Sequence, residues 1–72
     1  MAQYLKINYM RRTDKQVYAI LKSSKKPLCR DELAIEADLT VRTIDRIINR
    51  LSKENLVRRV REERKTFYEP IS

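Results

Sequence analysis

Four polar residues share one face of a helix that the sequence predicts over residues 40–53: Arg42, Arg46, Asn49 and Lys53. At about 100° per residue they fall within an arc of roughly 60°. An arginine can donate two hydrogen bonds to guanine in the major groove of DNA, and an asparagine can make a bidentate contact with adenine. The spacing therefore predicts a helix face that contacts DNA bases, with Thr43 and Arg50 at its flank.

An aliphatic stripe about 100° wide lies on the opposite side of this helix, as expected for a face that packs into a core. It consists of Ile44, Ile47, Ile48 and Leu51. A tight turn at Asp38 and Leu39 leads into the helix, and Thr40 is the expected N-cap. Because the chain has no glycine, Asn55 is the residue best suited to the left-handed conformation that ends a helix.

Two shorter helices are expected before this one. Thr13 and Gln16 have the spacing of a capping box, and apolar residues follow at helical spacing over 17–21. That helix should end before Pro27, because the residue before a proline is displaced from helical geometry. The second helix is expected over 30–37, with acids in its first turn, where they suit the positive end of the helix dipole.

The apolar pattern changes after residue 56. Apolar residues flank a polar turn at 62–65: Val57, Val60, Phe67, Tyr68 and Ile71. This pattern is typical of a β-hairpin, with Pro70 closing the last strand. We therefore predict a fold that is mainly α with a small β-hairpin (α+β class), a three-helix winged helix-turn-helix over residues 13–71. Residues 1–12 are expected to form an N-terminal arm or dimerisation segment, and residues 4–10 fit a strand and a helix equally.

Composition favours one basic domain. The chain has 72 residues, 17 Lys or Arg and 10 Asp or Glu, and a net charge of +7. Five of these seven positive charges come from residues 41–65, which hold nine basic and four acidic residues. In a domain this small, such an excess on two consecutive elements favours nucleic acid as the partner, with an acidic membrane surface second.

Several chemistries are disfavoured by the residues present. The chain has no histidine and one cysteine, so we expect no Cys/His metal cluster, no internal disulfide and no cofactor. Ser23 and Ser24 have no histidine to activate them, so we expect no enzymatic activity. The acids Asp31, Glu32 and Glu36 are more simply interpreted as helix acids than as a catalytic or metal-binding cluster.

Cys29 precedes the expected second helix and leaves two interpretations open. A helix N-terminus lowers the pKa of a thiol, which would suit redox sensing, and a small semi-buried structural residue is the simpler interpretation. No signal peptide or apolar run long enough to span a bilayer is visible, so a cytoplasmic protein without a membrane partner is expected. Tyr4, Tyr9 and Tyr18 suit packing better than base stacking.

The chain resembles the DNA-binding lobe of MarR-type winged-helix regulators. The resemblance rests on Glu32-Leu-Ala34, Leu39-Thr40, Thr43-Ile44-x-Arg46 and Leu51-x-Lys53-x-Asn55-Leu-Val57-x-Arg59. The closing Arg64-Lys-Thr-Phe-Tyr68 with Pro70 is also similar to TrmB-type regulators. The resemblance covers residues 13–71. It implies that five residues face the major groove: Arg42, Thr43, Arg46, Asn49 and Arg50. Glu62-x-Arg64 is similar to the Asp-x-Arg of MarR wings, whose arginine enters the minor groove.

Two departures from this family bear on regulation. Asn55 stands where the family usually has glycine, and the long dimerisation helices of MarR proteins are absent. No small-molecule ligand is therefore expected. A single DNA-binding module makes an interface of only about 600–1,000 Å², so a homodimer on a repeated or palindromic site is expected.

These inferences define one predicted function. The chain is expected to bind double-stranded DNA sequence-specifically and to regulate transcription by repression, with helix 40–53 in the major groove and a basic wing at 61–66. The expected DNA-binding residues are Thr40, Arg42, Thr43, Arg46, Asn49, Arg50, Lys53, Arg61, Arg64 and Lys65. The alternatives are binding to a replication origin or partition site of a plasmid or virus, and a winged-helix protein-interaction module.

Overall fold

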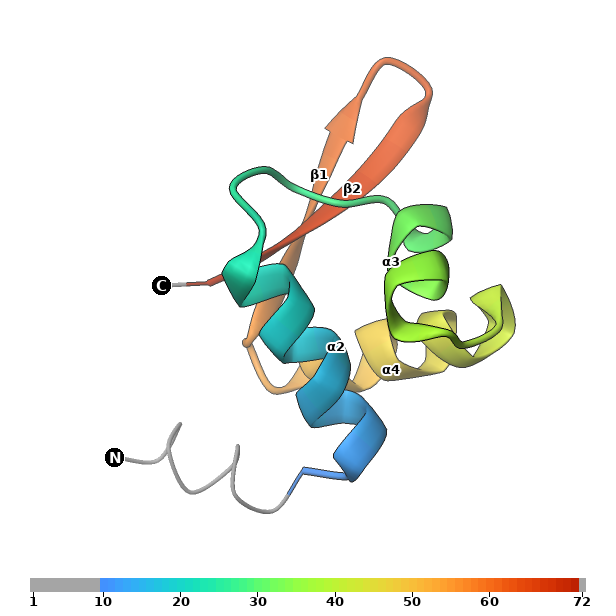
Figure 1. Ribbon diagram of the computed structural model, residues 1–72. Helices are drawn as coiled ribbons and strands as arrows, with labels where there is room; N and C mark the ends of the chain where they lie inside the picture. The colour runs from blue at the N-terminus through green and yellow to red at the C-terminus, as the bar shows by residue number, and fades with distance from the viewer. Residues whose placement is uncertain (1–9, 72) are drawn as a thin grey trace.

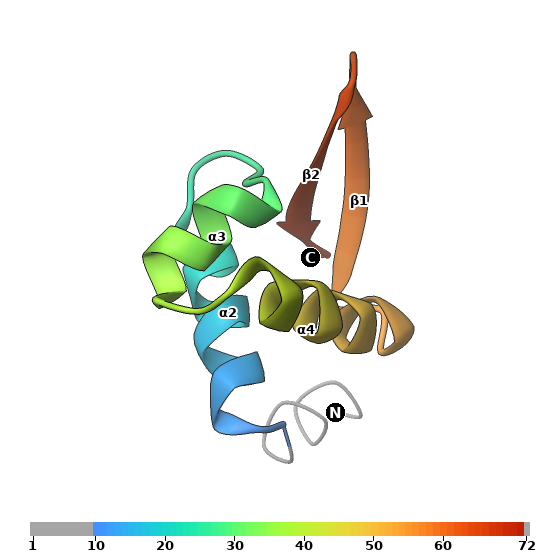
Figure 2. The same ribbon diagram turned by 90° about the vertical axis from the view of Figure 1, so that its right-hand side faces the viewer.

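Three helices followed by one β-hairpin make up residues 10–71, the part of the chain that the computed structural model describes (Figure 1). In chain order they are α2 (Arg12–Ser23), α3 (Arg30–Ala37), α4 (Val41–Lys53), β1 (Val57–Glu62) and β2 (Lys65–Pro70). The hairpin projects away from the helices, and α4 runs across its base (Figure 2). The predicted α+β class and the order of its elements are confirmed.

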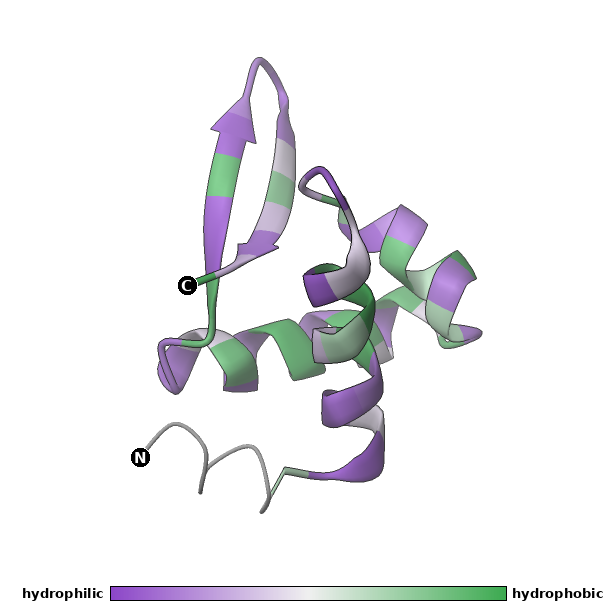
Figure 3. Ribbon diagram, turned by 60° about the vertical axis from the view of Figure 1, so that its left-hand side comes forward, coloured by the Kyte–Doolittle hydropathy of each residue, from purple (hydrophilic) through white to green (hydrophobic). Residues whose placement is uncertain are grey.

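One apolar core lies between the three helices and the base of the hairpin. The aliphatic stripe of α4 is its centre, because all four of its side chains are at most 1% exposed. Val17 and Leu21 of α2, Leu33 of α3 and Leu56 complete it with similar burial. Each such side chain contributes about 1.5–3 kcal/mol by leaving water. The hairpin is hydrophilic toward its tip, where it extends beyond this core (Figure 3).

Both α3 and α4 end on a left-handed residue that is not glycine. Asp38 has φ 57° and Asn55 has φ 60°. The residue after each one, Leu39 or Leu56, donates its backbone N–H back into the last helical turn at 3.0 Å. These bonds satisfy carbonyl groups that a helix end leaves unpaired, and Asn and Asp adopt this conformation at lower cost than other non-glycine residues. The predicted turn and the predicted stop at Asn55 are confirmed.

The first helix begins earlier than predicted. The expected capping box at Thr13 is wrong, because α2 starts at Arg12 with Arg11 as its N-cap and without a side-chain cap. Asp14 consequently lies in the first turn, where it suits the helix dipole and is drawn into the interior. Gln16, the other half of the expected box, instead donates its Nε2–H to the Ala37 carbonyl at the end of α3 (3.0 Å).

The hairpin pairs antiparallel, from Val57 opposite Pro70 to Glu62 opposite Lys65. It lies close to the predicted bounds. An additional pairing was not predicted: Leu28 forms an antiparallel bridge with Tyr68, with backbone bonds of 3.0 and 2.8 Å. The segment before α3 therefore fixes the outer edge of β2, which ties the hairpin to the helices.

The proposed division of the chain at residue 13 is not tested by these residues. Residues 1–9 lie outside the described part, and they hold most of the expected arm (1–12), most of the segment 4–10 that fits a strand and a helix equally, and the tyrosines at 4 and 9. Tyr18 lies within it and is 8% exposed, as expected for a packing residue.

Candidate nucleic-acid interface

The polar face of α4 is exposed in the structure. Arg42, Arg46, Asn49 and Lys53 all lie on the solvent side of the helix, opposite the buried stripe. At 1.5 Å per residue, the eleven-residue step from Arg42 to Lys53 gives a stripe about 16 Å long. We call these four residues the outer stripe of α4. The three cations in it form no hydrogen bond or ion pair with any residue from 10 to 71, so their donors are available to a ligand.

Thr40 and Thr43 hold the start of this helix. The Thr40 Oγ1 accepts the backbone N–H of Thr43 (3.1 Å) and donates to the Thr43 Oγ1 (2.9 Å). Thr40 is thus the N-cap that the sequence predicted. Both residues also belong to the predicted DNA-binding set, and Thr40 is exposed while Thr43 is half-buried. Their hydroxyl groups are already hydrogen-bonded to each other at the N-terminus of α4.

Arg50 is placed differently from the outer stripe. Its Nε and one terminal NH2 donate to the two carboxylate oxygens of Asp14, each at 2.9 Å. The Asp14 side chain is only 6% exposed and that of Arg50 is 39% exposed. The hydrogen bonds that Arg50 donates to Asp14 raise the pKa of Arg50. Arg50 therefore joins α4 to α2, and this engagement argues against its expected place on the DNA-contacting face.

A second ion pair engages Asp45, an acid on α4 beside the outer stripe. Arg30 at the start of α3 donates to the Asp45 Oδ2 of α4 (3.0 Å), and both side chains are about half exposed. An exposed pair of this kind contributes little stability, typically below about 1 kcal/mol. Its electrostatic effect is larger for a ligand, because Asp45 no longer presents an uncompensated negative charge beside Arg42 and Arg46.

The hairpin adds a second set of free cations. Arg61, Arg64 and Lys65 are exposed and form no hydrogen bond or ion pair within residues 10–71. Together with Arg30 and Asp31 at the start of α3, they line a hollow of about 440 Å³ between the hairpin and that helix. Four cations and one acid face this space. The arrangement suits an anionic group such as a phosphate.

One contact between the two basic elements was not predicted. Arg59 of β1 donates its NH2 to the Asn49 Oδ1 of α4 at 3.0 Å. Val57 and Tyr68 are buried on the face of the hairpin that packs on the core, and Arg59 lies on that face because it is two residues from Val57 and opposite Tyr68. Arg61 follows on the same face by the two-residue repeat. The basic surface therefore continues from α4 onto β1. The net charge of residues 41–65 indicates that the helix and the hairpin share a basic surface. The residues near Asn49 and Arg59 in the sequence do not indicate that these two side chains meet.

Cys29 occupies the capping position before α3, as the sequence suggested. It is 8% exposed, and its backbone N–H donates to the Glu32 Oε1 (3.0 Å). This backbone hydrogen bond is the main reason that the pKa of Glu32 lies below its ordinary value. Glu32 is therefore a capping acid of α3, in agreement with its interpretation as a helix acid.

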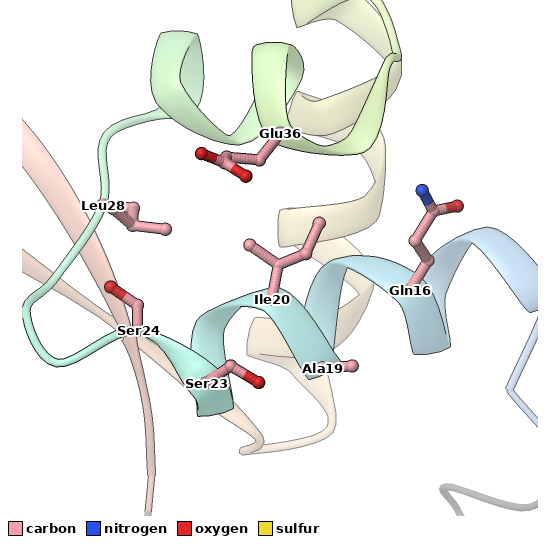
Figure 4. Close-up of a pocket in the computed structure, with 7 residues that line it drawn as sticks. All are labelled: Gln16, Ala19, Ile20, Ser23, Ser24, Leu28 and Glu36. Carbon is pink, nitrogen blue, oxygen red and sulfur yellow. The ribbon is translucent and has the colours of Figure 1, made fainter.

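An open groove lies apart from the basic surface, between α2 and α3. It has a volume of about 560 Å³ and is lined by Gln16, Ala19, Ile20, Ser23, Ser24, Leu28 and Glu36 (Figure 4). Its two serines have no histidine partner, because the chain contains none. No group of three or more Cys, Asp or Glu side chains that could hold a metal ion occurs among residues 10–71. Within the same residues, no helix is long and apolar enough to cross a bilayer.

No protein-family model and no curated protein sequence matches the chain. The solved structure of MepR, a transcription regulator of the Staphylococcus aureus multidrug efflux pump MepA, is similar to it with a TM-score of 0.84. The two chains are 15% identical, and the match covers 97% of this chain and 53% of that one. This likeness decides the fold. The chain is a winged helix-turn-helix. It spans about half the length of the MepR chain that it matches.

In the winged helix, α3 and α4 are the helix-turn-helix and β1–β2 is the wing. The predicted site residues divide into four groups in this framework. The three cations of the outer stripe and the wing cations are free, and Asn49 accepts a hydrogen bond from Arg59. Thr40 caps α4 with Thr43 as its partner, and Arg50 is engaged by Asp14.

Proposed function

We propose that this protein binds double-stranded DNA with α4 in the major groove. The observation that carries the proposal is the outer stripe: three free cations and an amide, held outward by a buried aliphatic stripe on the opposite side of the helix. A helix-turn-helix offers its second helix to the groove, and these residue types match the donor and acceptor pattern of base edges. Thr40, Arg42, Arg46, Asn49 and Lys53 are the proposed contacts on α4.

The wing contacts the neighbouring backbone or minor groove in this proposal. Arg61, Arg64 and Lys65 extend the basic surface beyond the reach of α4, and the hollow beside α3 takes a backbone phosphate. Such contacts position the protein without selecting a sequence. Lys65 and Arg64 therefore contribute affinity, and the outer stripe contributes sequence discrimination.

The biological role that we propose is regulation of transcription, by occupation of a promoter that represses it. The likeness of fold to a transcription regulator supports this role. Binding to a replication origin or partition site of a plasmid or virus uses the same surface and is the alternative within DNA binding. Selection of bound sequences from a random duplex pool, followed by a search for the selected site upstream of genes, separates these two roles.

Fluorescence anisotropy with a labelled random-sequence duplex tests the proposal. If about six phosphates are contacted, the affinity falls with salt with a log–log slope near about −5. The double variant Arg42→Ala/Arg46→Ala loses more affinity than the removal of two positive charges elsewhere on the surface, because its contacts in the groove are lost as well. Lys15→Ala/Lys25→Ala removes the same charge from exposed positions in and after α2 and serves as the matched control. An equal loss in both double variants would mean that net charge alone attracts DNA, and would contradict a specific role for α4.

We also propose that the protein binds as a homodimer on a repeated or palindromic site, with residues 4–10 as the partner surface. One DNA-binding module has a small interface, and a second copy doubles it. Light scattering with and without the selected duplex tests this. A monomer mass in both conditions, with one protein per duplex, contradicts the dimer and leaves DNA binding standing.

A protein-interaction module is the candidate function of a different class. The groove between α2 and α3 and the 80% exposed Ile35 of α3 favour it, because both offer apolar surface away from the cations. A gel shift on random duplex DNA distinguishes the two functions. Binding that is abolished by Arg42→Ala/Arg46→Ala and retained by Ile35→Ser supports DNA as the partner.

A further inference from the structure

We propose that Arg59 determines the base preference of Asn49, so that the two side chains together bind guanine and disfavour adenine. The proposal rests on the proposed function, insertion of α4 into the major groove, and adds to it a specificity residue on the wing strand. The expectation from sequence was the reverse, since an isolated asparagine suits adenine.

The contact between the two residues determines how the Asn49 amide is turned. The Arg59 NH2 lies 3.0 Å from the Asn49 Oδ1. A guanidinium has five donors and no acceptor, so only the carbonyl end of an amide can face it. The hydrogen bond is also charge-assisted, which makes it stronger than a bond between neutral groups. The Asn49 Nδ2 is therefore the end of the amide that stays available to a ligand.

Adenine and guanine present different edges to this arrangement. Adenine offers one acceptor (N7) and one donor (the N6 amino group), so its bidentate contact with asparagine needs Oδ1 as an acceptor. In this structure a cation already occupies one side of Oδ1, and a base amino group would have to approach it beside the donors of Arg59. Guanine offers two acceptors, N7 and O6. The Asn49 Nδ2 and the remaining Arg59 N–H groups form a set of donors that matches guanine.

The neighbouring arginine provides a matched control. Arg58 lies on the opposite face of β1, where it pairs with its cross-strand partner Glu69. It carries the same charge one residue away and makes no contact with Asn49 among those found in residues 10–71. Arg58→Met and Arg59→Met therefore make the same change in side chain and charge, and only the second removes the bond to Asn49.

The experiment is a selection from a pool of DNA duplexes with a randomised central region. Four proteins are compared: the wild type, Asn49→Ala, Arg59→Met and Arg58→Met. The position that Asn49 contacts is the one whose preference disappears in Asn49→Ala. At this position the wild type and Arg58→Met are expected to favour guanine over adenine by about 10-fold, within the range for one bidentate contact. Arg59→Met frees Oδ1 and is expected to shift the ratio of adenine to guanine upward by about 10-fold or more.

Two selection results would overturn the proposal while DNA binding stands. One concerns the ratio of adenine to guanine at that position: it would overturn the proposal if the wild type favoured adenine, or if Arg59→Met had the same ratio as the wild type. The other is an unchanged selected sequence in Asn49→Ala, which would mean that Asn49 contacts no base. If no protein enriches any sequence, the proposed function itself fails.

A measurement on the free protein separates these failures. The side-chain amide of Asn49 gives a ¹H–¹⁵N resonance pair, which is expected to shift in Arg59→Met and to remain in place in Arg58→Met. An unshifted pair in Arg59→Met shows that the contact is absent, and overturns the proposal even where DNA is bound. A shifted pair without sequence enrichment assigns the failure to the proposed function.

Discussion

Two arginines on α4, one helical turn apart, have opposite uses. Arg46 lies in the outer stripe, exposed, without a hydrogen bond or ion pair in residues 10–71. Arg50 lies at the edge that faces α2, where it donates two hydrogen bonds to the nearly buried Asp14. On a helical wheel they are about 40° apart. The same residue type therefore offers free donors at position 46 and links two helices at position 50.

The difference shows that charge alone does not define a binding face. Arg50 counts toward the positive charge of residues 41–65, yet Asp14 cancels it locally and restrains its donors. Arg46 has no such partner, so a ligand need not break an existing bond to use it. A basic helix face should therefore be judged by the donors that the fold leaves free. The following predictions test this difference, from the largest expected effect to the smallest.

Replacing Arg50 should destabilise the fold, because it leaves the Asp14 carboxylate in the interior without its partner. Breaking a buried pair costs about 3–5 kcal/mol, and the partial exposure of Arg50 reduces this to about 2–3 kcal/mol. Arg50→Met should therefore lower Tm by about 10–20 °C in thermal unfolding. Arg46→Met is the matched control and should change the free energy of unfolding by less than about 0.5 kcal/mol.

The double variant Asp14→Leu/Arg50→Met sharpens this test. Because it removes both charges, it should recover a large part of the stability lost in Arg50→Met. Equal destabilisation by Arg46→Met and Arg50→Met would show that the two arginines are equivalent in the fold, and the comparison would then be wrong.

For DNA binding the order of the two arginines should be reversed, with Arg46 more important than Arg50. Arg46→Ala should reduce discrimination between the selected site and its single-base variants by about 1–2 kcal/mol, since a base contact is lost. Lys65→Ala should weaken binding to all duplexes alike, because a phosphate contact carries no sequence information. Anisotropy titrations on a set of point-substituted duplexes measure both. Unchanged affinity and base preference in Arg46→Ala would contradict the assignment of α4 as the base-contacting helix.

Thr40 lies between these two uses, because it is exposed and also caps α4. Thr40→Ala removes the acceptor for the Thr43 N–H and should lower the free energy of unfolding by about 1 kcal/mol. Thr40→Ser keeps the hydroxyl and should retain most of that stability. Urea unfolding of the three proteins gives the comparison. A loss of DNA affinity in Thr40→Ala without a loss of stability would show that the hydroxyl serves DNA and not the helix end.

The smallest effect concerns the capping acid of α3. Because the Cys29 N–H lowers the pKa of folded Glu32, the ionised form stabilises the fold above the ordinary pKa of 4.5. This stabilisation is lost as pH falls through the lower, folded value. Glu32→Gln should therefore have a slightly lower Tm than the wild type at neutral pH, and the difference should shrink below pH 4.5. A difference that grows with acidification would contradict this role of Glu32.

The elements predicted correctly have signals within a few residues of themselves. The bounds of α3, the cap at Thr40 and the left-handed stop at Asn55 follow from neighbouring residues, because capping and helix termination are local hydrogen-bonding problems. The hairpin was found for the same reason, since its turn and the change of apolar period are adjacent. The predicted start of α2 was wrong by two residues. Thr13 and Gln16 indicated a cap at Thr13, whereas in the structure the helix begins earlier and places Asp14 in its first turn, where Arg50 binds it.

By itself, the sequence determined the order of the elements, the aliphatic stripe of α4 and the four residues of the outer stripe, because helical periodicity relates residues that are close along the chain. Only the tertiary structure decided which of the cations are free. Asp14 and Arg50 are 36 positions apart, and Asn49 of α4 and Arg59 of β1 are 10 positions apart on separate elements. Such pairs form when packing brings separate elements together. The residues around a charged side chain in the sequence therefore do not indicate which distant residue will bind it.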